Sequence, residues 1–462
     1  MKRMLFGAMP VALLAGAPVP AQQTPAAPVS PTIASGVAVF SPTAEQVALI
    51  EQAKRVGATD VTTASGPDGG MILGGKLDGR RFSLGVPRGW NRQLLLFAGG
   101  YATPGAQPTL PDDPIVKDPA AGMLRDAYGQ GFAAGVTIYD KNGIGTETAT
   151  RNLLALRAFA GRLGASRAYL AGGSMGGNIV LSLIEQHPRA FVGATALCGV
   201  THGWLSEIGA LADMRAAYTV LTAGTPYALP GGQDVTRSGL PVTPPAGDTT
   251  DGDAFRAAQK LKLAAPVLAL FTAARTHPDG PEARIIRQVA AIGGFAPDVV
   301  AVATPLYVAA LGMDDIVATM GGLPVGNVGK LYRPVEMAAA ETAAFNAKIQ
   351  RFQADPRATA YARKWHEATG RFSIPLVTVH QTIDSLVPFS QSEALGRIVA
   401  RAGNGRNLIQ YAVPPTRMKL PIPGDFEGYT HCGFTSEQGA GAFRVLRSWV
   451  ETGKRPAPDA IK

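Results

Sequence analysis

The sequence predicts an α/β protein with a mostly parallel sheet covered by helices on both faces. Short apolar runs alternate with stretches of helical period, as expected for buried parallel strands joined by crossover helices. This alternation occurs twice, before and after a long Ala-rich segment. Hydrophobic residues make up 46 % of the 462 residues and charged residues 17 %, a composition typical of globular proteins.

The first part of the chain predicts a helix, a hairpin and then alternating strands and helices. A helix is expected over 44–56 after Ser41-Pro42, because proline suits a first helical turn. The apolar runs 71–73 and 81–86 flank Asp78-Gly79, a typical turn dipeptide, and therefore predict a β-hairpin. The strands expected next are 93–97, 131–138, 167–170 and 190–197, and the helices are 148–163 and 174–187.

The alternation stops after residue 200 and resumes near residue 372. The intervening residues, 201–371, are Ala-rich, helical in pattern and poor in strand signals. The strands expected after them are 374–380 and 408–413, and the helices are 392–402 and 436–452. We therefore interpret 36–200 and 372–462 as two parts of one core, and 201–371 as a helical insertion that covers one end of the sheet as a lid.

The first residues predict export. Met1-Lys2-Arg3 precedes an apolar stretch that ends at Val19-Pro20-Ala21, where small residues suit cleavage by a signal peptidase. The apolar run is too short to span a bilayer, so we interpret 1–21 as a signal peptide and the Pro- and Ala-rich residues 22–35 as a flexible leader. The mature chain is expected to be periplasmic or secreted, without membrane insertion.

The net charge of +9 does not by itself indicate a nucleic-acid partner, because Lys and Arg are scattered and no run exceeds a pair such as Arg80-Arg81. We expect no nucleic acid, no metal and no cofactor. Residues 248–253 contain three aspartates but lack the distal glutamate of a calcium loop, and the sequence has no phosphate-cradling motif. The sequence leaves the oligomeric state open.

A candidate nucleophile lies in the pentad Gly172-Gly173-Ser174-Met175-Gly176. An apolar run precedes it and an amphipathic stretch follows it, which is the strand–turn–helix setting that a G-x-S-x-G turn requires. Glycines let the backbone bend sharply, and the start of the following helix directs N–H groups at a developing oxyanion. The pattern therefore predicts an exposed, reactive Ser174.

A serine hydroxyl needs a base, and the base needs an orienting acid. Asp384 follows the first strand after the insertion, and His431 follows the next strand through a long loop. The carboxyl ends of parallel strands share one edge of a sheet, so both residues are expected near Ser174. Asp425 and Glu427 are alternative acids, but they precede His431 in the same loop, where reaching the far imidazole nitrogen is awkward.

An oxyanion hole requires two N–H donors that are fixed before the reaction. Met175, directly after the candidate nucleophile, is expected to supply one. The second is expected from the loop after strand 93–97, where Gly99-Gly100-Tyr101 follows. The N–H of Tyr101 is the favoured donor, and that of Gly100 is the alternative.

Cys198 and Cys432 are the two cysteines of the chain. In an oxidising compartment an even count favours one disulfide, while two buried free thiols are the alternative. Cys432 adjoins His431, and Cys198 ends a strand at the same edge of the sheet. A bridge between them would tie the histidine loop to the sheet and fix the imidazole.

With these motifs the chain resembles the α/β-hydrolase superfamily, specifically exported serine esterases with a helical lid. The likeness covers roughly 71–200 and 372–455 and rests on Gly172-Gly173-Ser174-Met175-Gly176-Gly177, Asp384-Ser385-Leu386-Val387-Pro388 and His431. It implies that Ser174 is the nucleophile, Asp384 the triad acid and His431 the base. The glycine-rich string is similar to that of homoserine O-acetyltransferases. The His431-Cys432 pair is similar to that of tannases and feruloyl esterases, in which a cysteine directly precedes the serine, where this chain has Gly173.

These observations predict an exported serine hydrolase that cleaves small-molecule or oligomeric carboxylic esters through an acyl-enzyme. Acyl transfer and aminopeptidase action through the same triad are the alternatives. An aminopeptidase would need carboxylates of the insertion to hold a substrate ammonium, and Asp314, Asp315 or Glu336 could serve. The sequence does not identify the ester.

Overall fold

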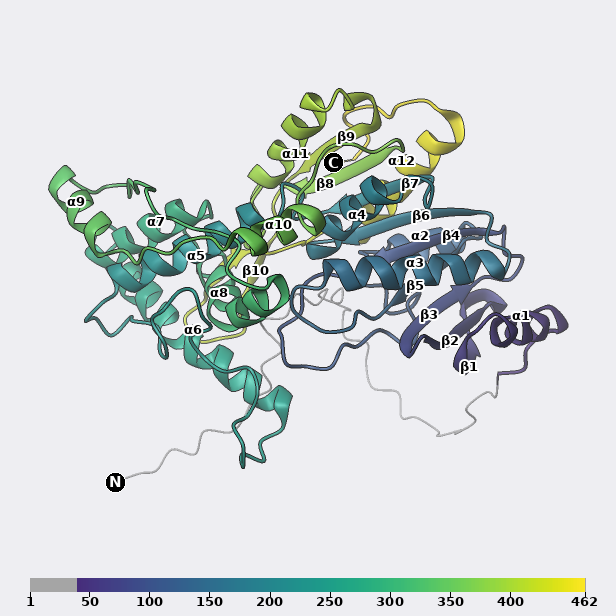
Figure 1. Cartoon of the computed structure of the whole chain (residues 1–462), viewed down its shortest axis with the longest axis horizontal. Coiled ribbons are helices and arrows are strands. Elements are labelled where there is room, and N and C mark those ends of the chain that lie inside the picture. Colours follow the sequence, from purple (N-terminus) through teal and green to yellow (C-terminus); the bar gives the residue numbers. More distant parts are fainter. Residues whose placement is uncertain (1–39, 462) are drawn as a thin grey trace, which may run out of the picture.

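The computed structural model describes residues 40–461 (Figure 1). The predicted signal peptide and leader, 1–21 and 22–35, lie outside the described residues. Within 40–461, nine strands form one sheet in the order β1-β2-β3-β5-β4-β6-β7-β8-β9. The pairs β1-β2, β2-β3 and β3-β5 are antiparallel, and all pairs from β5-β4 to β8-β9 are parallel. The predicted class, a mostly parallel sheet, is confirmed.

The strands of this sheet are β1 (Thr59–Ser65), β2 (Met71–Leu77), β3 (Arg80–Val86), β4 (Gln93–Ala98), β5 (Ala133–Thr137), β6 (Arg167–Gly173), β7 (Gly193–Leu197), β8 (Leu376–Gln381) and β9 (Leu408–Val413). A separate hairpin sheet consists of β10 (Arg417–Lys419) and β11 (Glu427–Tyr429). The helices of the core are α1 (Ala44–Arg55), α2 (Met123–Gly129), α3 (Thr146–Arg162), α4 (Met175–Gln186), α11 (Ser390–Arg401) and α12 (Ser436–Thr452).

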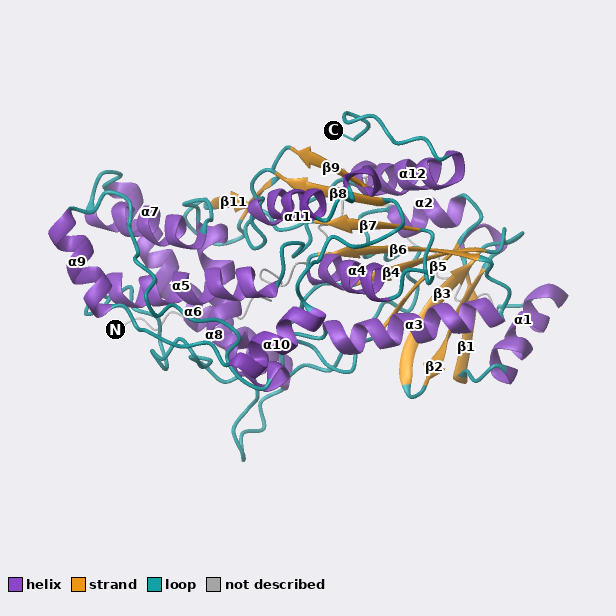
Figure 2. Cartoon of the chain, turned by 45° about the horizontal axis from the view of Figure 1, so that its top comes forward, coloured by secondary structure: helices purple, strands orange, loops and turns teal. Residues whose placement is uncertain are grey.

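Helices cover both faces of the sheet, as Figure 2 shows. Helices α3, α4 and α11 contribute to the hydrophobic cluster on one face, and α2 and α12 contribute to the cluster on the other. The central strands are buried on both sides: β7, for example, has no residue that is even partly exposed. This explains why the strands could be recognised as short, continuous apolar runs.

Two core elements were not expected from the sequence. Strand β1 lies at the edge of the sheet and is exposed along almost its whole length, so Thr59–Ser65 has no apolar face that marks a strand. Helix α2 has only seven residues, too few for a helical period to stand out. The other core elements start and end within a few residues of the expected bounds, except that β2 extends to Leu77 rather than residue 73.

Between β7 and β8 the chain forms a helical insertion with a hydrophobic cluster of its own. Its helices are α5 (Trp204–Leu221), α6 (Gly252–Thr276), α7 (Pro281–Gly293), α8 (Val299–Met320), α9 (Ala339–Lys348) and α10 (Pro356–Trp365). In Figure 2 the arrows of β7, β8 and β9 point toward this insertion. Helix α8 is long and apolar enough to cross a membrane, but 78 % of its most apolar stretch is buried within the protein, as in the core helix of a soluble protein.

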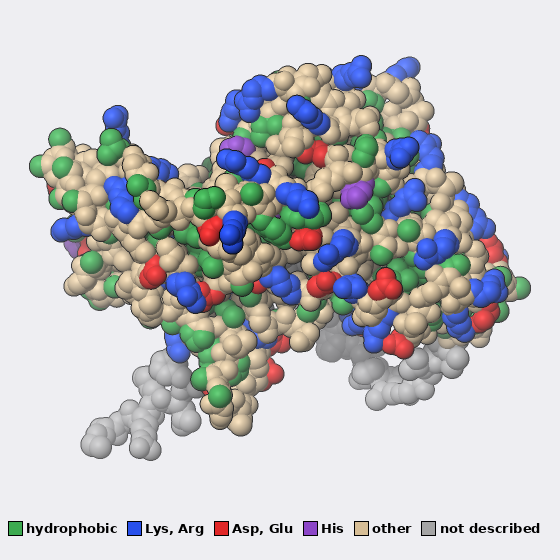
Figure 3. Space-filling view, in the orientation of Figure 1, with side chains coloured by type: hydrophobic (Ala, Val, Ile, Leu, Met, Phe, Trp, Pro, Cys, Tyr) green, Lys and Arg blue, Asp and Glu red, His purple; other side chains and the backbone are tan. Residues whose placement is uncertain are grey.

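The two ends of the insertion meet beside helix α4. Gly203 and Glu367 form an isolated β-bridge. The side-chain amide of Asn178 on α4 donates to the carbonyls of Val200 and His366, at 3.1 and 2.8 Å. The insertion therefore leaves and rejoins the core at one place, directly next to the helix that begins after Ser174. Lys and Arg side chains are spread over the face drawn in Figure 3, with acidic groups among them.

Candidate active site

Ser174 lies in the sharp turn between β6 and α4. Its backbone has φ 56° and ψ −122°, a conformation that L-residues rarely adopt and that is found mainly where the surroundings impose it. The Ser174 N–H donates to the carbonyl of Leu197 at 3.0 Å, and its carbonyl accepts from the N–H groups of Gly177 and Val200. These bonds hold the strained residue in place at the carboxyl end of β6.

Close backbone packing explains three glycines of the turn. A Cβ on Gly172 would lie 2.3 Å from the carbonyl oxygen of Gly176, and one on Gly176 would lie 2.0 Å from the carbonyl oxygen of Ala98. A Cβ on Gly177 would approach the Cα of Gly199 to 2.6 Å. Helix α4 can therefore start against β4 and β7 only because these side chains are missing. At Gly173 a Cβ would meet its nearest neighbour at 3.6 Å, an ordinary contact.

The structure brings Ser174, His431 and Asp384 into one hydrogen-bonded chain. His431 Nε2 lies 2.8 Å from Ser174 Oγ, and His431 Nδ1 lies 2.7 Å from Asp384 Oδ1. The side chain of Asp384 has no exposed surface, whereas that of His431 is 14 % exposed. An imidazole held in this way can take a proton from the serine hydroxyl while the carboxylate stabilises the imidazolium that forms.

The carboxylate of Asp384 is prepared for this position by several donors. Its Oδ1 also accepts from the N–H groups of Leu386 and Val387, and its Oδ2 accepts from the N–H of Cys432 at 3.1 Å. Burial alone would raise the pKa of Asp384, but the charge and the hydrogen bond of His431, together with these amides, lower it below its ordinary value. Asp384 therefore stays ionised although it is buried.

The competing residues are occupied elsewhere. Asp425 is exposed and pairs with Lys419 at 3.3 Å. Glu427 is also near Lys419, at 3.9 Å. The imidazole of His380 is buried at the end of β8, with Nε2 2.9 Å from the carbonyl oxygen of Val387.

The residues expected to form the oxyanion hole surround Ser174. A Cβ on Gly100 would lie 3.2 Å from the Cβ of Ser174, so the loop after β4 passes directly beside the serine. Tyr101 and Ser174 line the same pocket, and Met175 begins α4. Among the described residues, the backbone N–H groups of Gly100, Tyr101 and Met175 have no hydrogen-bond acceptor. The choice between Gly100 and Tyr101 as second donor stays a prediction.

Cys198 and Cys432 form a disulfide with a Cα–Cα distance of 5.4 Å, so the predicted pairing is confirmed in the structure. Cys198 directly follows β7, and Cys432 follows His431 in the loop after β11. Both residues have positive φ angles, 44° and 55°. The bridge connects the histidine loop to the strand beside the serine turn, and a disulfide of this kind is typical of an oxidising compartment.

A narrow pocket begins at Ser174 and runs under the insertion. Its walls come from the loop after β4, from α5 and α8, and from the loop after Asp384. Most of the wall is apolar, with Leu211, Val308 and Leu386 among its members. The insertion thus covers the edge of the sheet that carries the serine.

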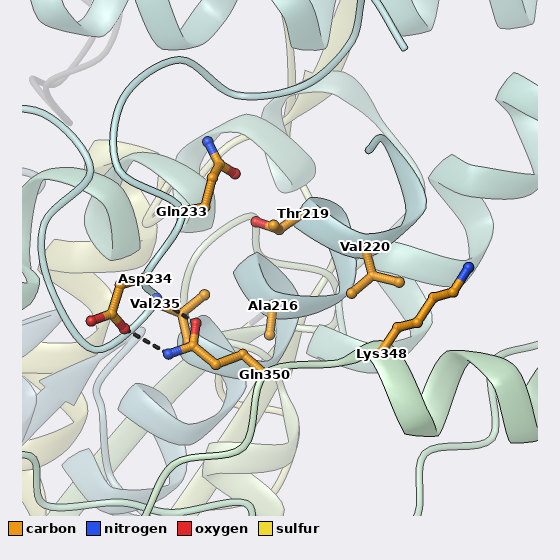
Figure 4. Close-up of a pocket in the computed structure, with 8 residues that line it drawn as sticks. All are labelled: Ala216, Thr219, Val220, Gln233, Asp234, Val235, Lys348 and Gln350. Atoms are coloured by element: carbon orange, nitrogen blue, oxygen red, sulfur yellow. Dashed lines mark hydrogen bonds between the residues drawn. The ribbon is translucent and has the colours of Figure 1, made fainter. Parts of the chain in front are cut away.

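A larger hollow, of about 340 Å³, opens on the insertion itself (Figure 4). Asp234 and Gln350 are hydrogen-bonded to each other there, and Thr219, Gln233 and Lys348 contribute further polar groups. Ser174 and His431 are not among the eight described residues that line this hollow. We therefore assign the chemistry to the narrow pocket.

Sequence reasoning missed two polar residues of the narrow pocket, Trp204 and Glu207 on the first turn of α5. Glu207 is only 2 % exposed, and burial, with a smaller effect from the charge of Asp384, raises its pKa to about 8. One signal could have drawn attention to it: Glu207 is an acid within the otherwise mostly apolar start of the insertion.

One cluster in the described part of the chain has the composition of a metal site. The potential ligand atoms of Cys198, His431 and Cys432 lie within 4.8 Å of one another. The two sulfurs are bonded to each other, however, and His431 Nε2 faces Ser174. We therefore assign no metal to this cluster.

No protein-family model matches the sequence, and no curated protein sequence matches it. Among solved structures, the chain is similar to feruloyl esterase B from Aspergillus oryzae, with 13 % identity and a TM-score of 0.40 over 87 % of this chain and 86 % of that one. An esterase from Aspergillus oryzae has 12 % identity and a TM-score of 0.38 over 84 % and 80 % of the two chains. Est1E from Butyrivibrio proteoclasticus has 13 % identity and a TM-score of 0.33 over 83 % and 97 %. At these identities and TM-scores the likeness carries no argument about this chain. The chain has the α/β-hydrolase fold by its own strand order and by the serine turn between β6 and α4.

Proposed function

We propose that this α/β-hydrolase is an exported serine hydrolase of carboxylic esters. The observation that carries the proposal is the continuous hydrogen-bonded chain from Ser174 Oγ through His431 to Asp384, at 2.8 and 2.7 Å. The strained serine turn and the free backbone N–H groups beside it support the same reaction. Export is supported by the N-terminal sequence and by the disulfide, and the helical insertion (residues 201–371) serves as the lid.

The reaction has two halves. Ser174 Oγ attacks the ester carbonyl while His431 Nε2 takes the hydroxyl proton, and the negative charge on the carbonyl oxygen is held by backbone N–H groups. The C–O bond to the alcohol then breaks, and His431 returns the proton to the leaving alcohol. Water attacks the acyl-enzyme in the same way, with its proton passing through His431 to Ser174, and releases the acid.

The aminopeptidase alternative loses support because the carboxylates it needs are engaged. Asp314 is paired with Arg237, Asp315 with Lys141, and Glu336 with Arg287. Acyl transfer uses the same first half-reaction and differs only in the second acceptor. Adding an alcohol acceptor and measuring the ratio of new ester to free acid distinguishes transfer from hydrolysis.

Ser174→Ala tests the assignment of the nucleophile. We expect it to abolish release of p-nitrophenol from short acyl esters and to abolish covalent labelling by an organophosphonate that reacts with activated serines. Ser182→Ala, on the same helix, is the matched control and should keep both properties, because the Ser182 hydroxyl accepts a hydrogen bond from Gln186, which is no part of the triad. Unchanged esterase activity in Ser174→Ala would overturn the proposal.

Two measurements test the accompanying predictions. Mass spectrometry of the N-terminus of the exported protein should show cleavage after Ala21, and an uncleaved chain in the cytoplasm would contradict export. Weakening one contact between the insertion and the core through Asn178→Ala, which removes the hydrogen bond to the carbonyl of His366, should change the dependence of activity on acyl chain length if the insertion is the lid.

A further inference from the structure

Three buried polar atoms, each on a residue that lines the narrow pocket, have no hydrogen-bond partner in residues 40–461. They are the hydroxyl of Tyr101, the indole Nε1 of Trp204 and the carboxyl Oε1 of Glu207. An unpaired buried polar atom costs free energy, so native proteins contain few of them. Three such atoms occur on residues that line one small pocket together with Ser174, so a ligand that enters this pocket is a candidate partner for them.

The carboxyl of Glu207 is held in place by the protein. Glu207 Oε2 accepts from Gln391 Nε2 at 3.1 Å, and Gln391 Oε1 in turn accepts from the N–H of His202 at 2.7 Å. The backbone N–H of Trp204 donates to the carbonyl of His366. One oxygen of the Glu207 carboxyl is thus fixed by Gln391, while the other is left without a protein partner. Such a fixed group can discriminate between ligands, because it cannot turn away to find another partner.

The hydroxyl of Tyr101 packs against helix α8 at Gly312. A Cβ on Gly312 would lie 2.4 Å from this hydroxyl. The space left in the pocket is about 10 Å³, enough for one group of the size of a water molecule or a hydroxyl. The rest of the wall, including Leu211 and Val308, is apolar and encloses this small space.

From this arrangement we infer that the enzyme prefers short-chain esters that carry a hydroxyl group near the scissile carbonyl, and that Glu207, Trp204 and Tyr101 recognise this hydroxyl. A hydroxyl both donates and accepts, so it can bond to the indole N–H and to the carboxyl group at once. Burial keeps Glu207 protonated at neutral pH, which favours a neutral hydroxyl over an ammonium. A plain alkyl chain would exclude water from these groups without pairing them, and a site of this kind discriminates strongly against it.

This inference rests on the proposed ester hydrolysis, and its test uses rates on matched substrates. The full-length enzyme is assayed by pH titration with ethyl butanoate, ethyl 3-hydroxybutanoate, ethyl 3-aminobutanoate and 3-hydroxypropyl butanoate. We expect kcat/KM at least tenfold higher for one of the two hydroxylated esters than for ethyl butanoate. Ethyl 3-hydroxybutanoate carries its hydroxyl on the acyl side of the ester, and 3-hydroxypropyl butanoate carries it on the alcohol side. A preference for the amino ester would overturn the inference.

Variants of α5 separate recognition from a structural role. Glu207→Leu should reduce the preference for the hydroxylated ester to less than threefold, mainly through the rate on that ester. Glu207→Gln, which keeps polar atoms at the position, should retain part of the preference. Thr219→Ala, on the same helix but lining the larger hollow instead of the pocket at Ser174, is the control and should leave the ratio within about threefold of the wild type.

The outcomes distinguish this inference from the proposed function. If the wild type hydrolyses the alkyl and hydroxylated esters at equal kcat/KM, the pocket holds only a structural water and the inference is wrong, while the esterase assignment stands. An equal loss on both esters in Glu207→Leu would likewise show a purely structural role. If none of the esters is hydrolysed and Ser174 is not labelled by the organophosphonate, the proposed function itself fails.

Discussion

Replacing Glu207 by glutamine should make the stability of the protein less sensitive to pH. The carboxyl of Glu207 is 2 % exposed, and burial raises its pKa from 4.5 to about 8. In the unfolded chain this carboxyl is in water, and its pKa returns to the ordinary value of 4.5. Glu207→Gln keeps a side chain of nearly the same size but cannot ionise, so the difference between wild type and variant isolates this one proton.

The sign and the size of the effect follow from proton linkage. Below pH 4.5 the carboxyl is protonated in both states, and ionisation contributes nothing to the difference. Between pH 4.5 and about 8 the unfolded wild type releases the proton while the folded protein keeps it, so wild-type stability falls relative to the variant by about 1.4 kcal/mol per pH unit. Above pH 8 the wild type has lost at most roughly 5 kcal/mol of unfolding free energy relative to the variant.

The assay is thermal and urea unfolding of both proteins from pH 4.5 to 9. Groups that do not interact with Glu207 titrate equally in both proteins and cancel in the difference. Glu393→Gln, which replaces an exposed glutamate on α11, corrects for the loss of one negative charge. The measured quantity is the difference in unfolding free energy between wild type and Glu207→Gln. If this difference stays constant over the pH range, or shifts in favour of the wild type as pH rises, the reasoning about burial is refuted.

Three further predictions concern the serine turn and the triad. Gly176→Ala would place a Cβ 2.0 Å from a carbonyl oxygen of β4, so we expect urea unfolding to show a loss of about 1–3 kcal/mol in unfolding free energy. Gly173→Ala, whose Cβ would have its nearest neighbour at 3.6 Å, should lower the unfolding free energy by less than about 1 kcal/mol. Equal losses in the two variants would contradict the packing argument. Replacing Cys198 and Cys432 together by alanine opens a loop of 234 residues and should lower the unfolding free energy by up to about 5 kcal/mol. It should also lower kcat of the folded protein, because the histidine loop is no longer tied to β7. Full activity in the folded double variant would show that the bridge does not position the base. Asp384→Asn should lower kcat by about 10⁴-fold with p-nitrophenyl esters, since an amide favours the wrong imidazole tautomer. A decrease in kcat of less than tenfold would assign the orienting role to another group.

The sequence by itself was sufficient for the fold class and for the candidate triad. Both depend on local patterns: apolar runs mark buried strands, and the glycine pentad marks the turn at Ser174. The positions of Asp384 and His431 after successive strands then place them at one edge, because parallel strands end on the same side of a sheet. The pairing of Cys198 with Cys432 could be predicted for the same reason.

The tertiary structure alone decided which other residues share that edge. Glu207 and Trp204 come from the first turn of an inserted helix, and no local pattern shows that they lie beside Tyr101, about a hundred positions earlier. The partner that fixes Glu207 is Gln391, 184 positions away. Burial and pairing of a polar group depend on every element packed around it, whereas strand order depends on patterns that the chain carries locally. The candidate reaction could therefore be predicted from the sequence, while the groups proposed to select the substrate emerged only from the folded chain.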